Sequence, residues 1–184
     1  NGLVRIATVA TSIGAITDLN VTLRLAGGWN GDLYAYLVHG SGFSVLLNRV
    51  GRTGTAPWGY GDPGMDVTLD DQASDVHVYR LNPNTPLGGP LTGPWAPDGR
   101  TNNPLTVVDF NPRTALLASF NGLNPNGEWL LFVADLASGD HRKLVLWELR
   151  YLVRPSRPYV AAGTHDGGMR QRNQFQRRSQ RHRP

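Results

Sequence analysis

The sequence has no cysteine among its 184 residues. This absence excludes a disulfide scaffold, a thiol nucleophile and a cysteine-ligated zinc site. No stretch approaches the roughly 18 consecutive apolar residues that a membrane-spanning helix needs, so we expect no membrane span. No initiator methionine and no apolar leader opens the chain, and we expect position 1 to be a mature or trimmed start.

The chain is rich in residues that form turns. Its 22 glycines and 13 prolines divide it into short segments. Turn signals recur about every ten residues, which is typical of β-sandwiches and barrels. Between turns, apolar and polar residues alternate as in half-buried strands. In Ile16 to Leu25, for example, one face collects Leu19, Val21, Leu23 and Leu25. The sequence therefore predicts an all-β fold, with one domain over residues 1–153.

The strands of that domain can be placed from the pattern. We expect them at Leu3 to Val9, Ile16 to Leu25, Asp32 to Val38, Phe43 to Val50, Met65 to Leu69, Val76 to Leu81, Glu128 to Asp135 and Arg142 to Val153. The third and fourth should pair as a hairpin, and so should the last two. Residues 82–112 are rich in proline and glycine and predict a long excursion without a regular ladder. Residues 114–120 fit either a helical turn or a strand.

Apolar residues occupy both faces of the strand Glu128 to Asp135. A strand of this kind belongs in the middle of a sheet, covered by a second sheet or a long loop. Trp129 in this strand and Trp147 in the next one are therefore expected in the core.

Charge divides the chain in two. Residues 1–153 carry ten Arg and Lys against thirteen Asp and Glu, whereas residues 154–184 carry eight Arg and a single acidic residue, Asp166. The second segment, rich in Arg and Gln, predicts a disordered tail. Nucleic acid is not an expected partner, except that such a tail would bind it or other anionic surfaces without sequence specificity. A shifted reading frame beyond the domain remains an alternative origin for it.

No catalytic constellation is evident. The serines near turns, such as Ser41, Ser44 and Ser138, lie in no Gly-x-Ser-x-Gly motif. Nucleophilic catalysis needs a base within reach of the nucleophile, and no spacing of the five histidines indicates such a pair. The sequence predicts a non-catalytic domain.

Four segments resemble a known family. They are ITDLNVTL (16–23), NGDLYAYL (30–37) with the turn 39–42, VTLDDQA (67–73), and FNGLNPNGEWLLFVAD (120–135) followed by LVLWEL (144–149). Together they are similar to the P domain (P/Homo B domain) of subtilisin-like proprotein convertases, over about residues 3–152. The fourth segment is the most specific. The proline-rich excursion makes the chain resemble stand-alone bacterial members.

This resemblance implies a jelly-roll-like β-sandwich of about eight strands. It also implies an accessory module that stabilises or regulates a subtilisin-like serine protease, whose catalytic triad lies in a separate domain. The expected partner is a protein, and the expected location is secreted or at the bacterial cell surface.

Calcium is an expected ligand, because several P domains bind it. Asp18, Asp32, Asp70 and Asp71 lie at predicted turns or strand starts, where carboxylates and main-chain carbonyls meet. Calcium takes six to eight oxygen ligands of this type. The alternative is that these aspartates only cap main-chain amides in turns.

Aromatic residues in predicted loops indicate a different function. Trp29, Trp58, Tyr60 and Trp95 fall in such segments. Aromatic rings offer apolar platforms on which sugars stack, so carbohydrate binding is the alternative to an accessory module. These rings also fit a simpler role as lids over the ends of the sandwich.

Overall fold

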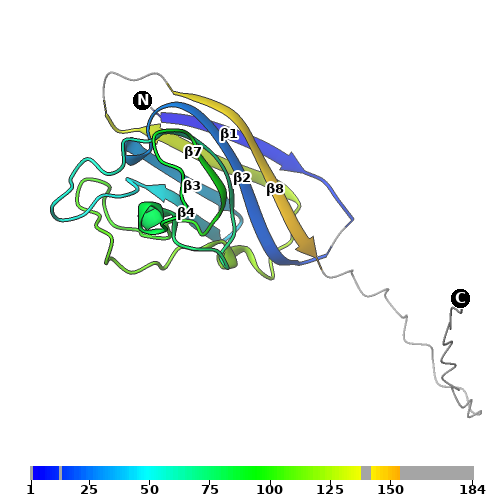
Figure 1. Ribbon diagram of the computed structural model, residues 1–184. Helices are drawn as coiled ribbons and strands as arrows, with labels where there is room; N and C mark the ends of the chain where they lie inside the picture. The colour runs from blue at the N-terminus through cyan, green and yellow to red at the C-terminus, as the bar shows by residue number, and fades with distance from the viewer. Residues whose placement is uncertain (1, 13, 138–141, 154–184) are drawn as a thin grey trace, which may run out of the picture.

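Two four-stranded sheets pack face to face in the computed structural model, which describes residues 2–12, 14–137 and 142–153 (Figure 1). The predicted tail, 154–184, lies outside the described residues. The strands are β1 (Gly2–Val9), β2 (Ile16–Trp29), β3 (Leu33–His39), β4 (Gly42–Asn48), β5 (Pro63–Leu69), β6 (Leu91–Trp95), β7 (Gly127–Asp135) and β8 (Lys143–Val153). Three 3-10 helices are η1 (Asn30–Asp32), η2 (Val76–Leu81) and η3 (Leu117–Phe120).

The first sheet has the order β1-β7-β3-β4 and the second the order β6-β5-β2-β8. All neighbouring strands are antiparallel except β5 and β6, which are parallel. The predicted all-β sandwich of about eight strands is therefore confirmed. No helix among the described residues has the length and apolar character needed to cross a membrane.

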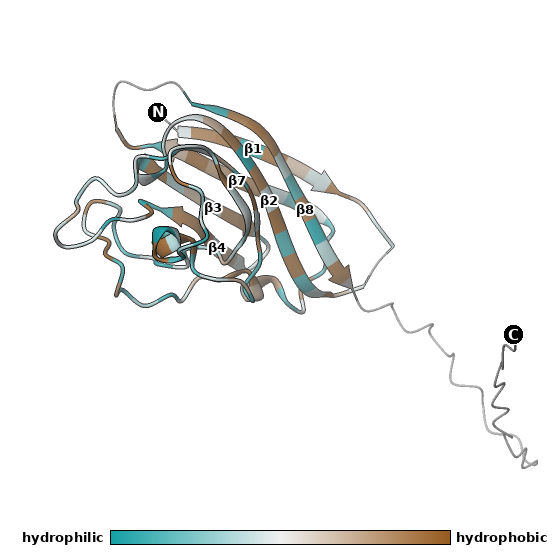
Figure 2. Cartoon of the chain, in the orientation of Figure 1, coloured by the Kyte–Doolittle hydropathy of each residue, from teal (hydrophilic) through white to brown (hydrophobic). Residues whose placement is uncertain are grey.

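The core lies between the sheets and follows the predicted alternation. Leu19, Val21 and Leu23 of β2 are at most 2% exposed, while Arg24 between core positions points outward. Figure 2 shows the same alternation of hydrophobic and hydrophilic residues along β2 and β8. Trp129 is fully buried, as predicted. Trp147 is only partly buried and packs against the core from the edge strand β8.

The predicted hairpin of the last two strands is wrong. β7 lies between β1 and β3, so both of its edges are already paired. β8 instead pairs with β2 in the opposite sheet. The two strands therefore belong to different sheets. The hairpin of β3 and β4 is confirmed.

Two other local predictions are corrected. Residues Val76–Leu81 form a 3-10 helix, not a strand, and the buried Val76 and Tyr79 are three residues apart, which matches its period. The proline-rich excursion contains one regular strand, β6, at the edge of its sheet, where Pro94 is tolerated. Residues Leu117–Phe120 take the helical alternative.

Candidate binding surfaces

The outer side of the sheet β1-β7-β3-β4 is apolar across all four strands. Residues directly opposite one another in a sheet point to the same side. One row of such partners is Val4, Phe132 and Tyr36, and the next is Ile6, Leu130, Val38 and Phe43. Val4, Ile6 and Phe43 are 48%, 56% and 37% exposed, and the other four are half-buried. We call these seven residues together with Tyr34 the apolar face.

The aromatic rings of the apolar face pack on one another. The rings of Tyr36 and Phe132 are stacked with centroids 4.8 Å apart, and Phe43 lies 5.6 Å from Tyr36 on the other side. Tyr34 meets Phe132 edge-on at 6.3 Å. Mutual packing fixes these side chains before any partner arrives, so binding would cost little side-chain entropy.

No charged residue belongs to the apolar face of the described strands, even though three of its eight positions are exposed to solvent. The nearest acidic residue in register is Glu128, opposite Thr8 at the border of the face. β1 pairs only with β7, so its other main-chain edge is unpaired within the described sheet. The edge strand β1 carries one exposed charge, Arg5, which lies opposite the core-facing Leu131 and therefore on the other side of the strand from Val4 and Ile6. An uncharged apolar face of this extent is unusual on a protein surface.

The sequence indicated that both sides of β7 are apolar. It did not indicate which of the two sides faces away from the core. Leu131 and Trp129 face the core and are fully buried. On the other side, Leu130 and Phe132 remain half-buried, and no strand of the described residues forms a second layer over them. The predicted place of this strand in the middle of a sheet is confirmed, whereas neither of the two described sheets packs over its outer side.

The four predicted loop aromatics do not form one platform. Tyr60 and Trp95 both pack edge-on against the buried ring of Tyr79, at 4.7 Å and 6.1 Å. Trp29 and Trp58 are 52% and 71% exposed. Among the four, only Trp95 lines a pocket of about 330 Å³.

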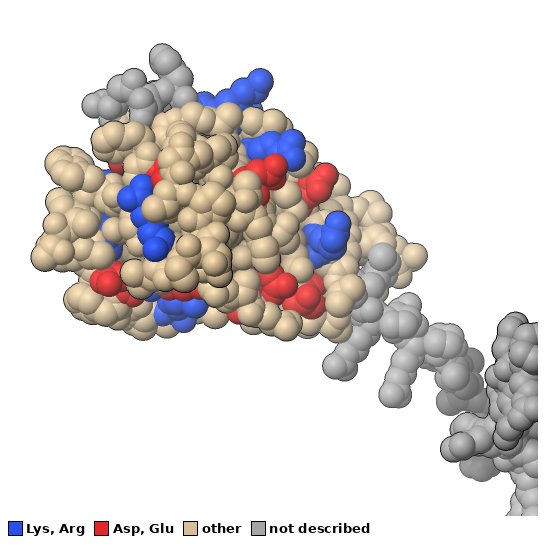
Figure 3. Space-filling view, in the orientation of Figure 1, with Lys and Arg blue, Asp and Glu red and all other residues tan. Residues whose placement is uncertain are grey.

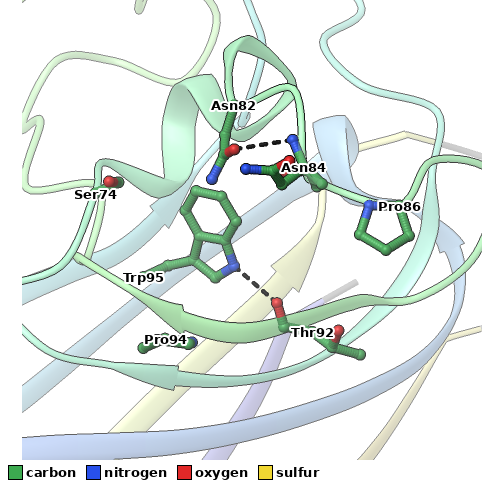
Figure 4. A pocket seen from close by; sticks show the side chains of 8 residues that line it. Ser74, Asn82, Asn84, Pro86, Thr92, Pro94 and Trp95 are labelled. Carbon is green, nitrogen blue, oxygen red and sulfur yellow. Dashed lines mark hydrogen bonds between the residues drawn. The ribbon is translucent and has the colours of Figure 1, made fainter.

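This pocket lies beside the edge strand β6 and the end of η2 (Figure 4). Asp62, only 2% exposed, holds the segment that forms one wall. Its carboxylate accepts hydrogen bonds from the Tyr79 hydroxyl (2.6 Å) and Arg80 Nε (2.8 Å) before that segment, and from the Gly88 amide (2.8 Å) after it. Burial alone would raise the pKa of Asp62, but these hydrogen bonds lower the pKa below its ordinary value.

The four aspartates of the predicted calcium site have separate surroundings. Asp71 accepts hydrogen bonds from the amides of Leu117 and Ala118 in η3, at 3.0 Å and 2.7 Å. Asp70 accepts one from the amide of Gln72. Asp32 is buried and lies 3.6 Å from both Arg49 and Arg142.

The fourth aspartate, Asp18, lies in β2 opposite Leu152. Within the described ranges, no three or more acidic or histidine side chains gather in a way that would hold a metal ion. Capping is therefore the observed role of Asp70 and Asp71, and calcium binding stays a prediction.

Neither described histidine presents a free base. His77 is fully buried, with Nδ1 2.6 Å from the carboxylate of Asp98 and Nε2 2.9 Å from the carbonyl oxygen of Arg52. His39 contacts two main-chain carbonyl oxygens, those of Glu128 and Asn124. The hydroxyl of Ser44 donates to the carbonyl of Ala115. The other three histidines lie outside the described residues.

Acidic and basic side chains are mixed on the side of the molecule that Figure 3 shows, with wide uncharged areas between them. No large area of one sign appears among the described residues in that view.

No family model, curated protein or solved structure matches this chain. The similarity to P domains therefore stays a prediction from the sequence segments that carry it.

Proposed function

We propose that the chain is a non-catalytic binding module that docks a protein partner on its apolar face. The observation that carries the proposal is the uncharged, aromatic-rich outer side of the first sheet, with Val4, Ile6 and Phe43 exposed. The cores of protein interfaces have this composition, depleted in charge and enriched in aromatic residues. Within the described sheet, the outer edge of β1 has no strand partner and adds main-chain groups to the same surface.

The partner's contact surface should itself be apolar. A charged partner would lose hydration on the face without gaining an opposite charge. The resemblance to P domains supports a subtilisin-like catalytic domain as the partner and an exported bacterial setting for the pair. The occupied nitrogens of His39 and His77 support a module without catalysis of its own.

A binding measurement with three variants tests this proposal. The immobilised full chain is titrated with the purified subtilisin-like catalytic domain whose gene lies nearest to its own. Ile6→Glu and Phe43→Glu each place a charge on the apolar face, and we expect each to weaken binding at least tenfold. Phe110→Glu is the matched control, since Phe110 is 81% exposed and lies outside the sheets.

Equal binding by the wild type and both face variants would show that the partner does not dock there. Sedimentation of the chain alone distinguishes a second copy as the occupant. If the chain self-associates with rising concentration, and the two face variants abolish this, the partner is another copy of the chain.

A further inference from the structure

The pocket beside β6 has an uncharged polar lining. Five of its eight lining residues carry hydroxyl or amide groups, namely Ser74, Asn82, Asn84, Thr85 and Thr92. The others, Pro86, Pro94 and Trp95, are apolar. None of these eight described residues is charged, so an ionised ligand would find no counter-charge among them. Its volume of about 330 Å³ is within the range of small-molecule sites.

Several polar groups of the lining are available to a ligand. The side chains of Ser74, Asn84 and Thr92 make no hydrogen bond within the described residues. The side-chain oxygen of Asn82 accepts from the Asn84 amide at 3.0 Å, which leaves its NH₂ group as a donor. The pocket thus presents uncharged hydrogen-bond donors and acceptors. Hydroxyl groups of a ligand can pair with either, because a hydroxyl group both donates and accepts.

The aromatic wall is held in place before a ligand binds. Trp95 Nε1 donates to the carbonyl oxygen of Thr92 at 3.0 Å, and the indole packs edge-on against Tyr79. Figure 4 shows the indole beside Asn82 and Asn84, with Pro86 and Pro94 flanking the pocket. Trp95 is only 5% exposed and forms the buried base of the pocket, so the exposed rings of Pro86 and Pro94 supply most of the apolar surface for C–H groups.

We propose that this pocket binds a neutral saccharide residue. Hydroxyl groups would bond to the amides and hydroxyls of the lining, and the C–H side of the sugar ring would lie against Pro86 and Pro94, next to the small exposed part of Trp95. An extended peptide fits less well, because β6 is a short edge strand in which Pro94 has no main-chain N–H to donate. The pocket belongs to the sheet opposite the apolar face, so this site is separate from the proposed protein-docking surface.

Nuclear magnetic resonance titration of the ¹⁵N-labelled full chain tests the proposal. The probes are glucose, galactose, mannose and N-acetylglucosamine, with cellobiose and chitobiose. Glucuronic acid and a proline-rich peptide serve as a charged comparator and a peptide comparator. We expect at least one neutral sugar to shift the indole N–H signal of Trp95 and the side-chain amide signals of Asn82 and Asn84 saturably. The Trp95 signal is assigned from its loss in Trp95→Phe.

Asn84→Ala should weaken that binding at least fivefold, while Trp58→Ala should leave it unchanged. Both residues are exposed, so each variant should fold, and a melting curve checks this. The proposal is overturned if no neutral sugar moves the pocket signals. It is also overturned if binding survives Asn84→Ala but is lost in Trp58→Ala, or if glucuronic acid or the peptide binds more tightly. None of these results bears on Ile6 or Phe43, so docking on the apolar face is judged independently.

Discussion

The imidazole ring of His39 stacks on the indole ring of Trp129, with centroids 4.0 Å apart and planes 4° from parallel. Both residues are buried. Nδ1 of His39 lies 2.8 Å from the carbonyl oxygen of Glu128, and Nε2 lies 2.7 Å from that of Asn124. His39 therefore joins the end of β3 to the start of β7 and to the turn that precedes it, and these contacts give it a structural role.

We expect His39→Ala to lower the free energy of unfolding by about 3 kcal/mol, because it leaves a cavity beside Trp129 and two carbonyl groups without their partner. Urea unfolding followed by tryptophan fluorescence measures this loss. His39→Phe keeps a ring over Trp129 and should recover part of it. A His39→Ala protein as stable as the wild type would show that the turn is held by other contacts.

The carboxylate of Asp62 makes stability depend on pH in the acidic range. Its folded-state pKa is below the ordinary value, because the hydrogen bonds from Arg80, Tyr79 and Gly88 outweigh the effect of burial. A lowered pKa stabilises the fold above the unfolded pKa of about 3.9, and this contribution disappears as the pH falls through the folded value. Asp62→Asn should thus be less stable than the wild type at pH 6, with the difference shrinking below about pH 4.

Asp66→Asn is the matched control for this measurement. Asp66 also pairs with an arginine, Arg24, at 2.8 Å, but the two side chains are 42% and 49% exposed. Exposed ion pairs contribute little, so we expect a change of less than about 1 kcal/mol. Urea unfolding at several pH values between 2 and 6 compares the three proteins. A constant difference between wild type and Asp62→Asn across that range would contradict the role of Asp62.

Asp71 joins the turn after β5 to η3. Asp71→Ala removes the acceptor of two amide hydrogen bonds, from Leu117 and Ala118. We expect a loss of about 1 kcal/mol, the typical cost of removing a helix cap. Unfolding in the presence of a chelator isolates this cost from any metal effect. An unchanged stability there would show that solvent replaces the cap.

The predicted calcium site is tested by melting the wild type with calcium and with chelator. Calcium that binds only the native state stabilises it by about 2.7 kcal/mol at a hundredfold excess over Kd, and this raises the melting temperature. Asp71→Ala should lack this increment if Asp71 is a ligand. Identical melting curves for the wild type in the two conditions would contradict calcium binding and leave the capping role of Asp71 intact.

The fold was predictable where one face of a strand is buried and the other is polar. In β2 the alternation around Leu19 to Leu25 places each side chain on its observed side. Strand partners were less predictable. The short segment after Asp135 fits a hairpin as well as a crossing between sheets, and only the filled edges of β7 decide between them. Periodicity also failed for Val76 and Tyr79, whose spacing of three fits a 3-10 turn.

The candidate sites were predictable only in part. Trp95 was indicated by its ring in a proline-rich segment, but nothing in the pattern distinguishes Asn82 and Asn84 from other loop amides. Their position in the pocket wall depends on the hydrogen bonds that the carboxylate of Asp62 accepts on either side of their segment, and Asp62 comes from another part of the chain. For the apolar face, the sequence showed only that one strand, β7, is apolar on both sides. The exposure of the face follows from the arrangement of the two described sheets, which the pattern of one strand does not give.

Gly59 permits the loop of residues 51–62 to approach η1 closely. A Cβ atom at this position would lie 2.5 Å from the carbonyl oxygen of Val50 and 2.8 Å from the Cα of Gly31. Both atoms belong to the main chain and cannot rotate away. The φ of Gly59 is also +70°, which other residues adopt only with strain. Main-chain hydrogen bonds from Gly31 to Tyr60 and from Tyr60 to Val50 depend on this approach.

We therefore expect Gly59→Ala to lower the free energy of unfolding by about 2 kcal/mol or more. Gly54→Ala in the same loop is the matched control. A Cβ there meets no atom within 4 Å, and Gly54 is not among the residues with positive φ. This variant should be neutral or slightly stabilising, because alanine reduces the freedom of the unfolded chain. Urea unfolding of the two variants side by side measures the difference, and equal stabilities would show that the loop can move away from η1 at no cost.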